Sequence, residues 1–245
     1  MNNENNEINY QFKALYLIGI ITVLFCHVFT DGGIPGLIYV LPLEGFNLAI
    51  FIFASGYLYK DKYSNMPLRY IWKKFKTLII PYFLLNLIYG GVAQIMHNWG
   101  FKFGGDFTIR NIFVQPIIDG HQFIYNLGGW FIFPLFGVMV VNVVLRCILR
   151  KLKCKDYIIF SLFLIIGIIG CSLPTRIEKT TWMLVLMRWM YFFPFFGFGF
   201  LYKERLEKYI DKVPFYIYFP ILIAVRVLIM ALYNWETPIY RVAFM

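Results

Sequence analysis

His27 is the side chain in this sequence best suited to acid–base chemistry, and it closes the apolar stretch LIGIITVLFCH. Near neutral pH an imidazole can take a proton from a hydroxyl, so His27 is a candidate general base. The alternative is an interfacial histidine whose ring is satisfied by a backbone carbonyl. In a helix, Tyr16 lies on the same face about 16 Å away, and Lys13 lies nearly on that face one turn farther along. Tyr16 and Lys13 are therefore candidates to act with His27.

Three charged side chains interrupt otherwise apolar stretches: Glu44, Arg188 and Arg226. A charged side chain that faces lipid costs about 2.5 kcal/mol or more. We therefore expect these three to face a bundle interior, a water-filled cavity or one another. An internal ion pair that fixes helix packing is the structural alternative, and Glu44 also suits the outer headgroup level. Arg188 is the better candidate for function, because a guanidinium can stabilise an oxyanion.

Two further motifs allow a functional and a structural interpretation each. Lys73, Lys74 and Lys76 form a cationic cluster that could hold phosphate groups, although anchoring to anionic lipid explains the same residues equally well. Ser55 and Gly56 end the stretch FNLAIFIFASG. A small pair of this kind lets two helices approach closely, so close packing is the prediction there.

Composition decides which class of protein holds these residues. Of 245 residues, 60% are hydrophobic and 15% are charged, against about 45–50% and about 25% in soluble domains. This balance excludes a disordered chain, a collagen, a disulfide scaffold and an ordinary soluble α/β enzyme. The class that remains is all-α, a polytopic bundle of transmembrane helices.

Charge and cysteine content exclude two kinds of ligand. The net charge of +10 raises nucleic acid as a partner. The basic residues, however, form short clusters between apolar runs rather than one stripe, so we expect no nucleic-acid binding. The four cysteines form no C-x-x-C pair, and no H-E-x-x-H motif occurs. No metal site is expected.

Seven apolar runs predict seven spans within one domain that covers residues 12–233. Before this domain, residues 1–11 form a polar cytoplasmic N-terminus without the basic start of a secretory signal, so the first run should remain in the mature protein. After it, residues 234–245 form a short outer C-terminal segment. The runs cover residues 12–29, 38–59, 78–96, 125–145, 157–173, 182–202 and 213–233.

The segments between these runs alternate in charge. Sixteen Lys and Arg residues fall on one side, namely Lys13 and those in the loops after the second, fourth and sixth runs, and five fall on the other. Cytoplasmic loops carry the excess of Lys and Arg, so the N-terminus is predicted to be cytoplasmic and the C-terminus outside. The longest outer segment, residues 97–124, is either a lid or a short re-entrant piece. No internal repeat, a mark of many transporters, is visible.

Five segments resemble the acyltransferase-3 family, whose members are bacterial inner-membrane acyltransferases that modify surface polysaccharides, peptidoglycan, lipids or antibiotics. The resemblance covers most of residues 12–212, and the segments occur in the family's order at matching topological places. The segments are LIGIITVLFCH, FIFASGYLY, WKKFKTLIIPYF, GGWFIFPLF and YFFPFFGFGFLYKERLEK.

The resemblance implies a multi-pass O-acyltransferase of the bacterial plasma membrane, surrounded by membrane lipid. It would move an acetyl or other short acyl group from cytoplasmic acyl-CoA, as co-substrate rather than bound cofactor, to a hydroxyl of an extracytoplasmic glycan. His27 matches the family's helix-one histidine, thought to be the essential base or proton relay. The three lysines match a basic segment that is a plausible partner for the CoA phosphates. Trp130 matches the tryptophan of the fourth helix.

The sequence also departs from the family. Tyr16 stands where many members carry arginine, and Lys13 is a candidate substitute for it. Asn47 stands where some relatives have a polar, histidine-containing segment that leads into the second helix. The family usually has more than seven spans, so this chain is either a short variant or lacks the last spans. Two alternatives therefore stay open: an inactive truncated member, and a non-catalytic polysaccharide or lipid transporter or flippase that uses Glu44, Arg188 and Arg226.

Overall fold

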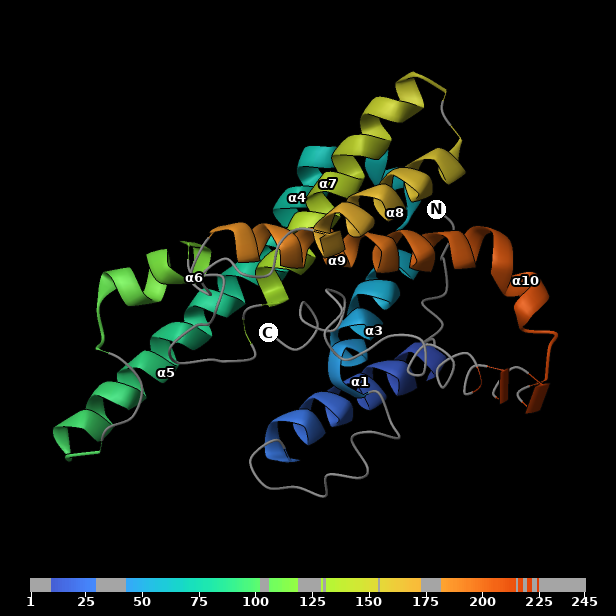
Figure 1. Cartoon of the computed structure of the whole chain (residues 1–245). Coiled ribbons are helices and arrows are strands. Elements are labelled where there is room, and N and C mark those ends of the chain that lie inside the picture. The colour runs from blue at the N-terminus through green and yellow to red at the C-terminus, as the bar shows by residue number, and fades with distance from the viewer. Residues whose placement is uncertain are drawn as a thin grey trace, which may run out of the picture.

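The structure is a computed structural model that describes residues 10–29, 43–101, 106–118, 129, 131–153, 155–172, 182–214, 216–217, 220–221 and 224. Within these ranges all regular structure is helical and no strand occurs, so the all-α prediction is confirmed there (Figure 1). The α-helices are α1 (Tyr10–Phe29), α3 (Leu43–Tyr57), α4 (Pro67–Lys74), α5 (Ile80–Asn98), α6 (Gln115–Ile118), α7 (Ile132–Lys151), α8 (Asp156–Ser172), α9 (Trp182–Leu201) and α10 (Glu207–Ile210). A 3-10 turn, η1 (Asp61–Asn65), and the π-helical turns η2 (Phe75–Ile79), η3 (Arg110–Val114) and η5 (Tyr202–Leu206) lie between them.

The helix bounds confirm some predicted runs and correct others. The fifth run coincides with α8, and the sixth begins with α9 at Trp182, although η5 and α10 continue that helix to Ile210. The third run was expected to begin at residue 78, but α4, η2 and α5 form one continuous helix from Pro67 to Asn98. The fourth run was expected to end at residue 145, but α7 continues to Lys151. Most of the seventh run lies outside the described residues. Basic residues assigned to loops therefore lie on helices.

Two helical stretches, Pro67–Asn98 and Ile132–Lys151, are long and apolar enough to cross a membrane. Shorter apolar helices cover Gln11–Val23, Leu48–Tyr57 and Asp156–Gly170. Of the seven predicted spans, two thus pass this test of length and composition among the described residues, and the others stay predictions.

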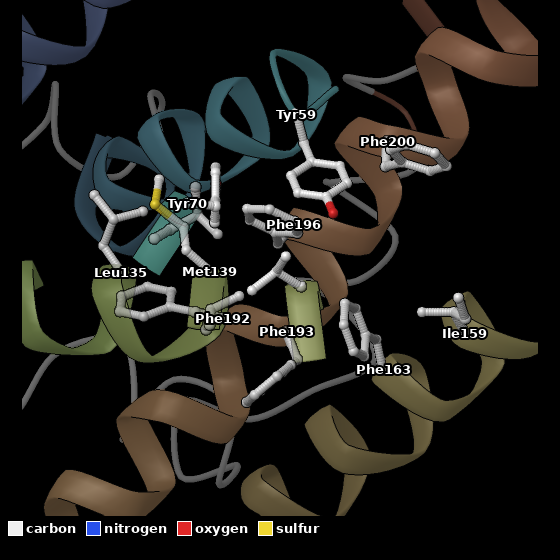
Figure 2. Packing of buried hydrophobic residues seen from close by; sticks show 13 residues of the cluster. Tyr59, Tyr70, Leu135, Met139, Ile159, Phe163, Phe192, Phe193, Phe196 and Phe200 are labelled. Atoms are coloured by element: carbon white, nitrogen blue, oxygen red, sulfur yellow. The ribbon is translucent and has the colours of Figure 1, made fainter. Parts of the chain in front are cut away.

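Helix α9 organises the core. It packs across α3, α7 and α8, and the cartoon shows it crossing these helices (Figure 1). Its Phe-rich sequence places aromatic rings toward all three neighbours, so the buried cluster forms around it (Figure 2). Aromatic side chains dominate such cores because each buries a large apolar area. The cluster includes Ile52, Tyr59, Tyr70, Leu135, Val138, Met139, Val143, Ile159, Phe163, Phe192, Phe193, Phe196 and Phe200.

The crossing of α3 and α9 depends on two facing glycines, as the small Ser-Gly pair predicts. A Cβ added at Gly56 would stand 2.0 Å from the carbonyl oxygen of Phe196, and one added at Gly199 would stand 2.1 Å from that of Phe53. Because both obstacles are backbone atoms, no side-chain rotation relieves the overlap. Only a residue without a side chain lets the two helices approach this closely.

We expect Gly56→Ala and Gly199→Ala each to lower the stability of the bundle by about 1–3 kcal/mol, since overpacking forces the helices apart. The measurement is the midpoint of thermal unfolding in detergent. Gly91→Ala is the matched control, because no described atom lies within 4 Å of a Cβ added there. In a helix interior that change is neutral or stabilising. Equal midpoints for the three variants would contradict the close crossing.

Helices α1 and α3 run antiparallel, so the start of α1 lies beside the end of α3. The rings of Phe12 and Tyr57 stack with centroids 4.2 Å apart, and those of Tyr16 and Phe51 lie 5.7 Å apart. The chain leaves α3 at this end for the first basic segment. Arg146 and Lys203 of the other two basic segments contact it at Asp61 and at Tyr59. The structure therefore gathers these segments and the start of α1 at one end of the bundle, as the charge alternation predicts; we refer to it as the basic end.

The predicted outer segment folds back along α5. From Phe83 to Asn98, α5 carries the chain about 22 Å. The chain then returns, and in η3 the ring of Phe113 lies 5.3 Å from that of Phe83, while the neighbouring Ile112 is buried. Of the two interpretations of residues 97–124, this geometry favours the re-entrant one for the described residues 106–118.

Candidate functional site

Several predicted site residues have only their backbone described. His27 lies in the last turn of α1, Glu44 and Asn47 lie in the first two turns of α3, and Arg188 lies in α9. The side chains of these four lie outside the described part of the structure, and Trp130 lies outside it entirely. Their predicted roles therefore stay predictions.

The backbone nevertheless fixes where His27 stands. Phe12 lies beside Tyr57 at the basic end, and His27 follows fifteen residues later in the same helix. Fifteen residues of α-helix advance about 22 Å. The histidine is thus separated from the basic end by most of the length of α1.

Tyr16, predicted as a candidate to act with His27, and Ser55, predicted to mark close packing, meet between α1 and α3. Their hydroxyls approach each other, and the Ser55 hydroxyl donates to the Phe51 carbonyl oxygen at 2.8 Å. Tyr16 is half-buried, whereas Lys13 is exposed on α1. Tyr16 rather than Lys13 therefore reaches the inner surface of the α1–α3 pair.

The three predicted phosphate-binding lysines do not share one face. Lys74 is half-buried, with Nζ 5.7 Å from the ring centroid of Tyr70, and Tyr70 is itself 4% exposed. Lys73 and Lys76 are exposed, and Lys76 Nζ lies 5.2 Å from the ring of Trp72, which is 56% exposed. Lys74 therefore faces the bundle, and the other two face away from it.

Ordinary helix geometry separates the three lysines, because successive residues lie about 100° apart around the axis. The π-helical turn η2 decides which later residues share the face of Lys74. Pro81 has no backbone N–H, and its ring would collide with the carbonyl of the preceding turn of an α-helix. The chain widens there, and the N–H of Ile80 bonds to the Phe75 carbonyl five residues back. In an α-helix, residues three or four apart share one face. Across this π-helical turn, residues five apart share it instead.

An inward stripe consequently runs along the whole helix from Pro67 to Asn98. Its members are buried apart from the half-buried lysine, and their spacing is three or four residues except for a single step of five across η2. The stripe consists of Tyr70, Lys74, Ile79, Tyr82, Asn86, Gly90 and Ala93.

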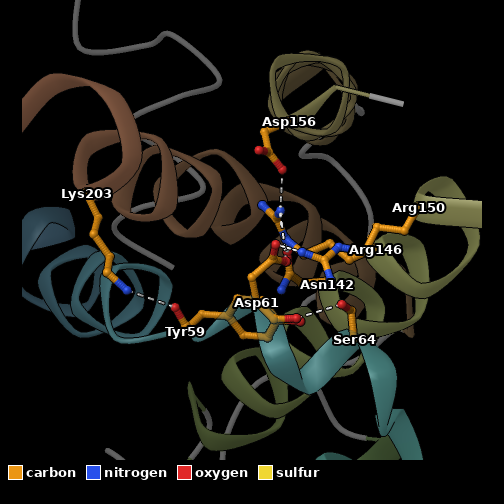
Figure 3. A network of polar contacts seen from close by, with 8 residues as sticks. All are labelled: Tyr59, Asp61, Ser64, Asn142, Arg146, Arg150, Asp156 and Lys203. Atoms are coloured by element: carbon orange, nitrogen blue, oxygen red, sulfur yellow. Dashed lines mark hydrogen bonds and ion pairs between the residues drawn. The ribbon is translucent and has the colours of Figure 1, made fainter. Parts of the chain in front are cut away.

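A charged centre that the sequence analysis did not single out lies at the basic end (Figure 3). Arg146 on α7 is 2% exposed. Its Nε donates to Asn142 Oδ1 at 3.0 Å, and its NH1 donates to Asp156 Oδ1 at 2.8 Å and lies 3.9 Å from Asp61 Oδ1. Arg150 forms an ion pair with Asp61. Asn142, Arg146 and Arg150 recur every fourth residue, and this spacing is the signal that could have revealed the centre.

Aromatic rings enclose the same guanidinium. Its central carbon lies 3.6 Å from the ring centroid of Phe200 and 5.6 Å from that of Tyr59. Lys203 Nζ donates to the Tyr59 carbonyl oxygen at 3.3 Å, so all three basic segments meet here. A buried charge is tolerated when paired in this way, and the centre ties η1, α7 and α8 together. Among the described residues, no group of three or more His, Cys, Asp or Glu side chains is arranged to hold a metal ion.

Comparison with known proteins yields one family. The sequence profile of the acyltransferase domain of the acyltransferase-3 family matches residues 9–245, nearly the whole chain. No curated protein and no solved structure matches the chain.

Proposed function

Because the chain belongs to the acyltransferase-3 family, we propose that it is a membrane-embedded O-acyltransferase. It moves an acyl group, acetyl in the first instance, from cytoplasmic acyl-CoA to a hydroxyl of an extracytoplasmic glycan. The observation that carries the proposal is the family match over residues 9–245, to which the structure adds a lysine at one end of the bundle and a histidine toward the other.

The membrane topology is part of this proposal. The chain crosses a bacterial plasma membrane seven times with its N-terminus in the cytoplasm. The twenty residues of α1 extend about 30 Å, which is the thickness of the hydrocarbon core. The clustering of the basic segments at one end supports a cytoplasmic assignment for that end, because Lys and Arg concentrate on the cytoplasmic side. His27 then stands near the outer surface, where a glycan arrives.

The proposed chemistry is a single acyl transfer. His27 takes the proton of the acceptor hydroxyl as its oxygen attacks the carbonyl carbon of the thioester. The new C–O bond forms, the C–S bond breaks, and CoA departs as a thiolate that receives a proton. Arg188, or a backbone donor near a glycine-rich helix start, stabilises the oxyanion on the way.

The donor enters at the basic end, where Lys73, Lys74 and Lys76 hold the CoA phosphates. Lys74 makes the closest contact because it faces the bundle, whereas Lys73 and Lys76 attract the donor from the membrane surface and also bind anionic headgroups.

We expect Lys74→Ala to raise the KM for acetyl-CoA about tenfold or more, since a charge-assisted contact contributes about 1.5–3 kcal/mol. Lys73→Ala and Lys76→Ala are the matched controls on the same helix, and each should raise KM less. Initial rates at varied acetyl-CoA, in vesicles that contain the full chain, give these constants. Three equal increases would show that the lysines act as one exposed cluster.

Donor dependence tests the proposed function. Vesicles from cells that express the chain should consume radiolabelled acetyl-CoA supplied to the cytoplasmic face and place the label on envelope material. Vesicles from cells without the chain set the background. If wild-type vesicles consume no donor but exchange a preloaded glycan or lipid by counterflow, the protein is a transporter or flippase, and the enzymatic proposal fails.

A further inference from the structure

Asn86 is a buried amide without a partner on the inward stripe. It is 0% exposed, and neither Nδ2 nor Oδ1 forms a hydrogen bond with any described residue. The Tyr82 hydroxyl, one turn away on the stripe, approaches the Asn86 amide, but neither amide atom meets the distance and angle of a hydrogen bond. A single Asn in an apolar run gives no spacing signal, so the sequence alone does not reveal it.

A buried amide without a hydrogen-bond partner destabilises the folded protein. Leaving a buried donor or acceptor unsatisfied costs about 1–3 kcal/mol, and no lipid group can supply the missing bond. Leucine would fill the same space without that cost. The sequence therefore holds at this position a group that packing alone does not require, and the group needs a partner that arrives from elsewhere.

The position of Asn86 indicates the partner. It lies twelve residues beyond Lys74 on the same inward face, about 18 Å farther along the helix. Acyl-CoA has the same layout, because its phosphates form one end and an uncharged arm carries the thioester away from them. With the phosphates at Lys74, the arm follows the stripe toward Asn86.

Aromatic rings surround the helix at this level. The ring of Tyr82 lies 5.1 Å from that of Phe133 on α7, and the ring of Phe83 lies 5.3 Å from that of Phe113 in the re-entrant segment. These rings make the surroundings apolar, where a hydrogen bond to a carbonyl is stronger than in water.

We propose that Asn86 binds the acyl thioester, donating a hydrogen bond from Nδ2 to its carbonyl oxygen on a path that begins at Lys74. This assignment rests on the proposed function and adds a residue to it. The amide orients the carbonyl for attack and contributes to stabilising the oxyanion that forms there. The π turn η2 has a role in this arrangement, because it places Lys74 and Asn86 on one face.

The test is Asn86→Leu in the full chain, assayed in vesicles with radiolabelled acetyl-CoA. We expect kcat to fall about 10²–10³-fold, the effect of removing one oxyanion donor. The thermal unfolding midpoint in detergent should stay unchanged or rise, because the substitution removes an unsatisfied amide. Asn98→Leu is the matched control: this exposed residue on the same helix accepts a hydrogen bond from Gln94 and should leave kcat unchanged.

Equilibrium binding gives a second measurement that does not need an acceptor. Asn86→Leu should weaken binding of acetyl-CoA several-fold but leave binding of CoA, which lacks the thioester carbonyl, unchanged. Lys74→Ala should weaken both. If wild type is active and Asn86→Leu retains wild-type kcat and wild-type preference for acetyl-CoA, Asn86 is not a binding residue. If wild type neither binds nor consumes acetyl-CoA, the proposed function fails, and the assignment of Asn86 as a thioester-binding residue fails with it.

Discussion

His27→Ala should reduce acyl transfer about 10²–10⁴-fold while the protein still inserts into the membrane, because it removes the proposed base. The base has to act where acceptor and donor meet. α1 places His27 about 22 Å from the ring pair at the basic end, which is roughly three-quarters of the thickness of a hydrocarbon core. Transfer of label from acetyl-CoA to envelope glycan is the measurement, with expression followed in the same membranes.

His97→Ala is the control for this substitution. His97 lies in the last turn of α5, which the proposed topology places at the same outer surface. Because no role in the transfer is assigned to it, activity should remain. Wild-type rates in His27→Ala would show that His27 is not the base, and the acceptor hydroxyl would then need another proton acceptor.

Hydropathy predicted the helices of this chain well where their ends are apolar. The fifth run matches α8 within one residue at each end, whereas the third begins eleven residues earlier than expected. The sixth begins at Trp182 as predicted, but η5 and α10 continue its helix past residue 202 to Ile210. The reason is that Lys and Arg are good helix formers but poor membrane residues. A run of lysines therefore ends an apolar pattern without ending a helix. The same effect hid the last turn and a half of α7.

Side-chain partners were less accessible from the sequence than the helices were. Lys73, Lys74 and Lys76 form one cluster in the sequence, and only the folded helix shows that Lys74 faces the bundle while the other two face away from it. Arg146 was assigned a topological role, since its partners Asp61 and Asp156 lie in other segments and are joined to it only by folding. His27, by contrast, was placed correctly at the end of α1, because its position depends on helix length alone.

In the charged centre at the basic end, removing the acidic partner should lower the stability of the protein more than removing the buried arginine. Asp156→Ala leaves the Arg146 guanidinium buried with Asn142 and the more distant Asp61, and we expect it to cost about 3 kcal/mol. That is the lower end of the range for breaking a buried pair, because Asp156 is itself 41% exposed and already partly hydrated. Arg146→Met removes the buried charge and keeps an unbranched chain against Phe200. It should cost less.

A double-mutant cycle separates the cost of an unpaired charge from the loss of packing. If the unpaired guanidinium causes the loss in Asp156→Ala, then adding Arg146→Met should restore most of the stability, and the two free energies will not add. The thermal unfolding midpoint in detergent, measured for wild type, both single variants and the double variant, gives the coupling. Additive losses would mean that Arg146 and Asp156 contribute separately to packing. A strong coupling would instead identify the pair as the interaction that holds α8 against α7 at the basic end.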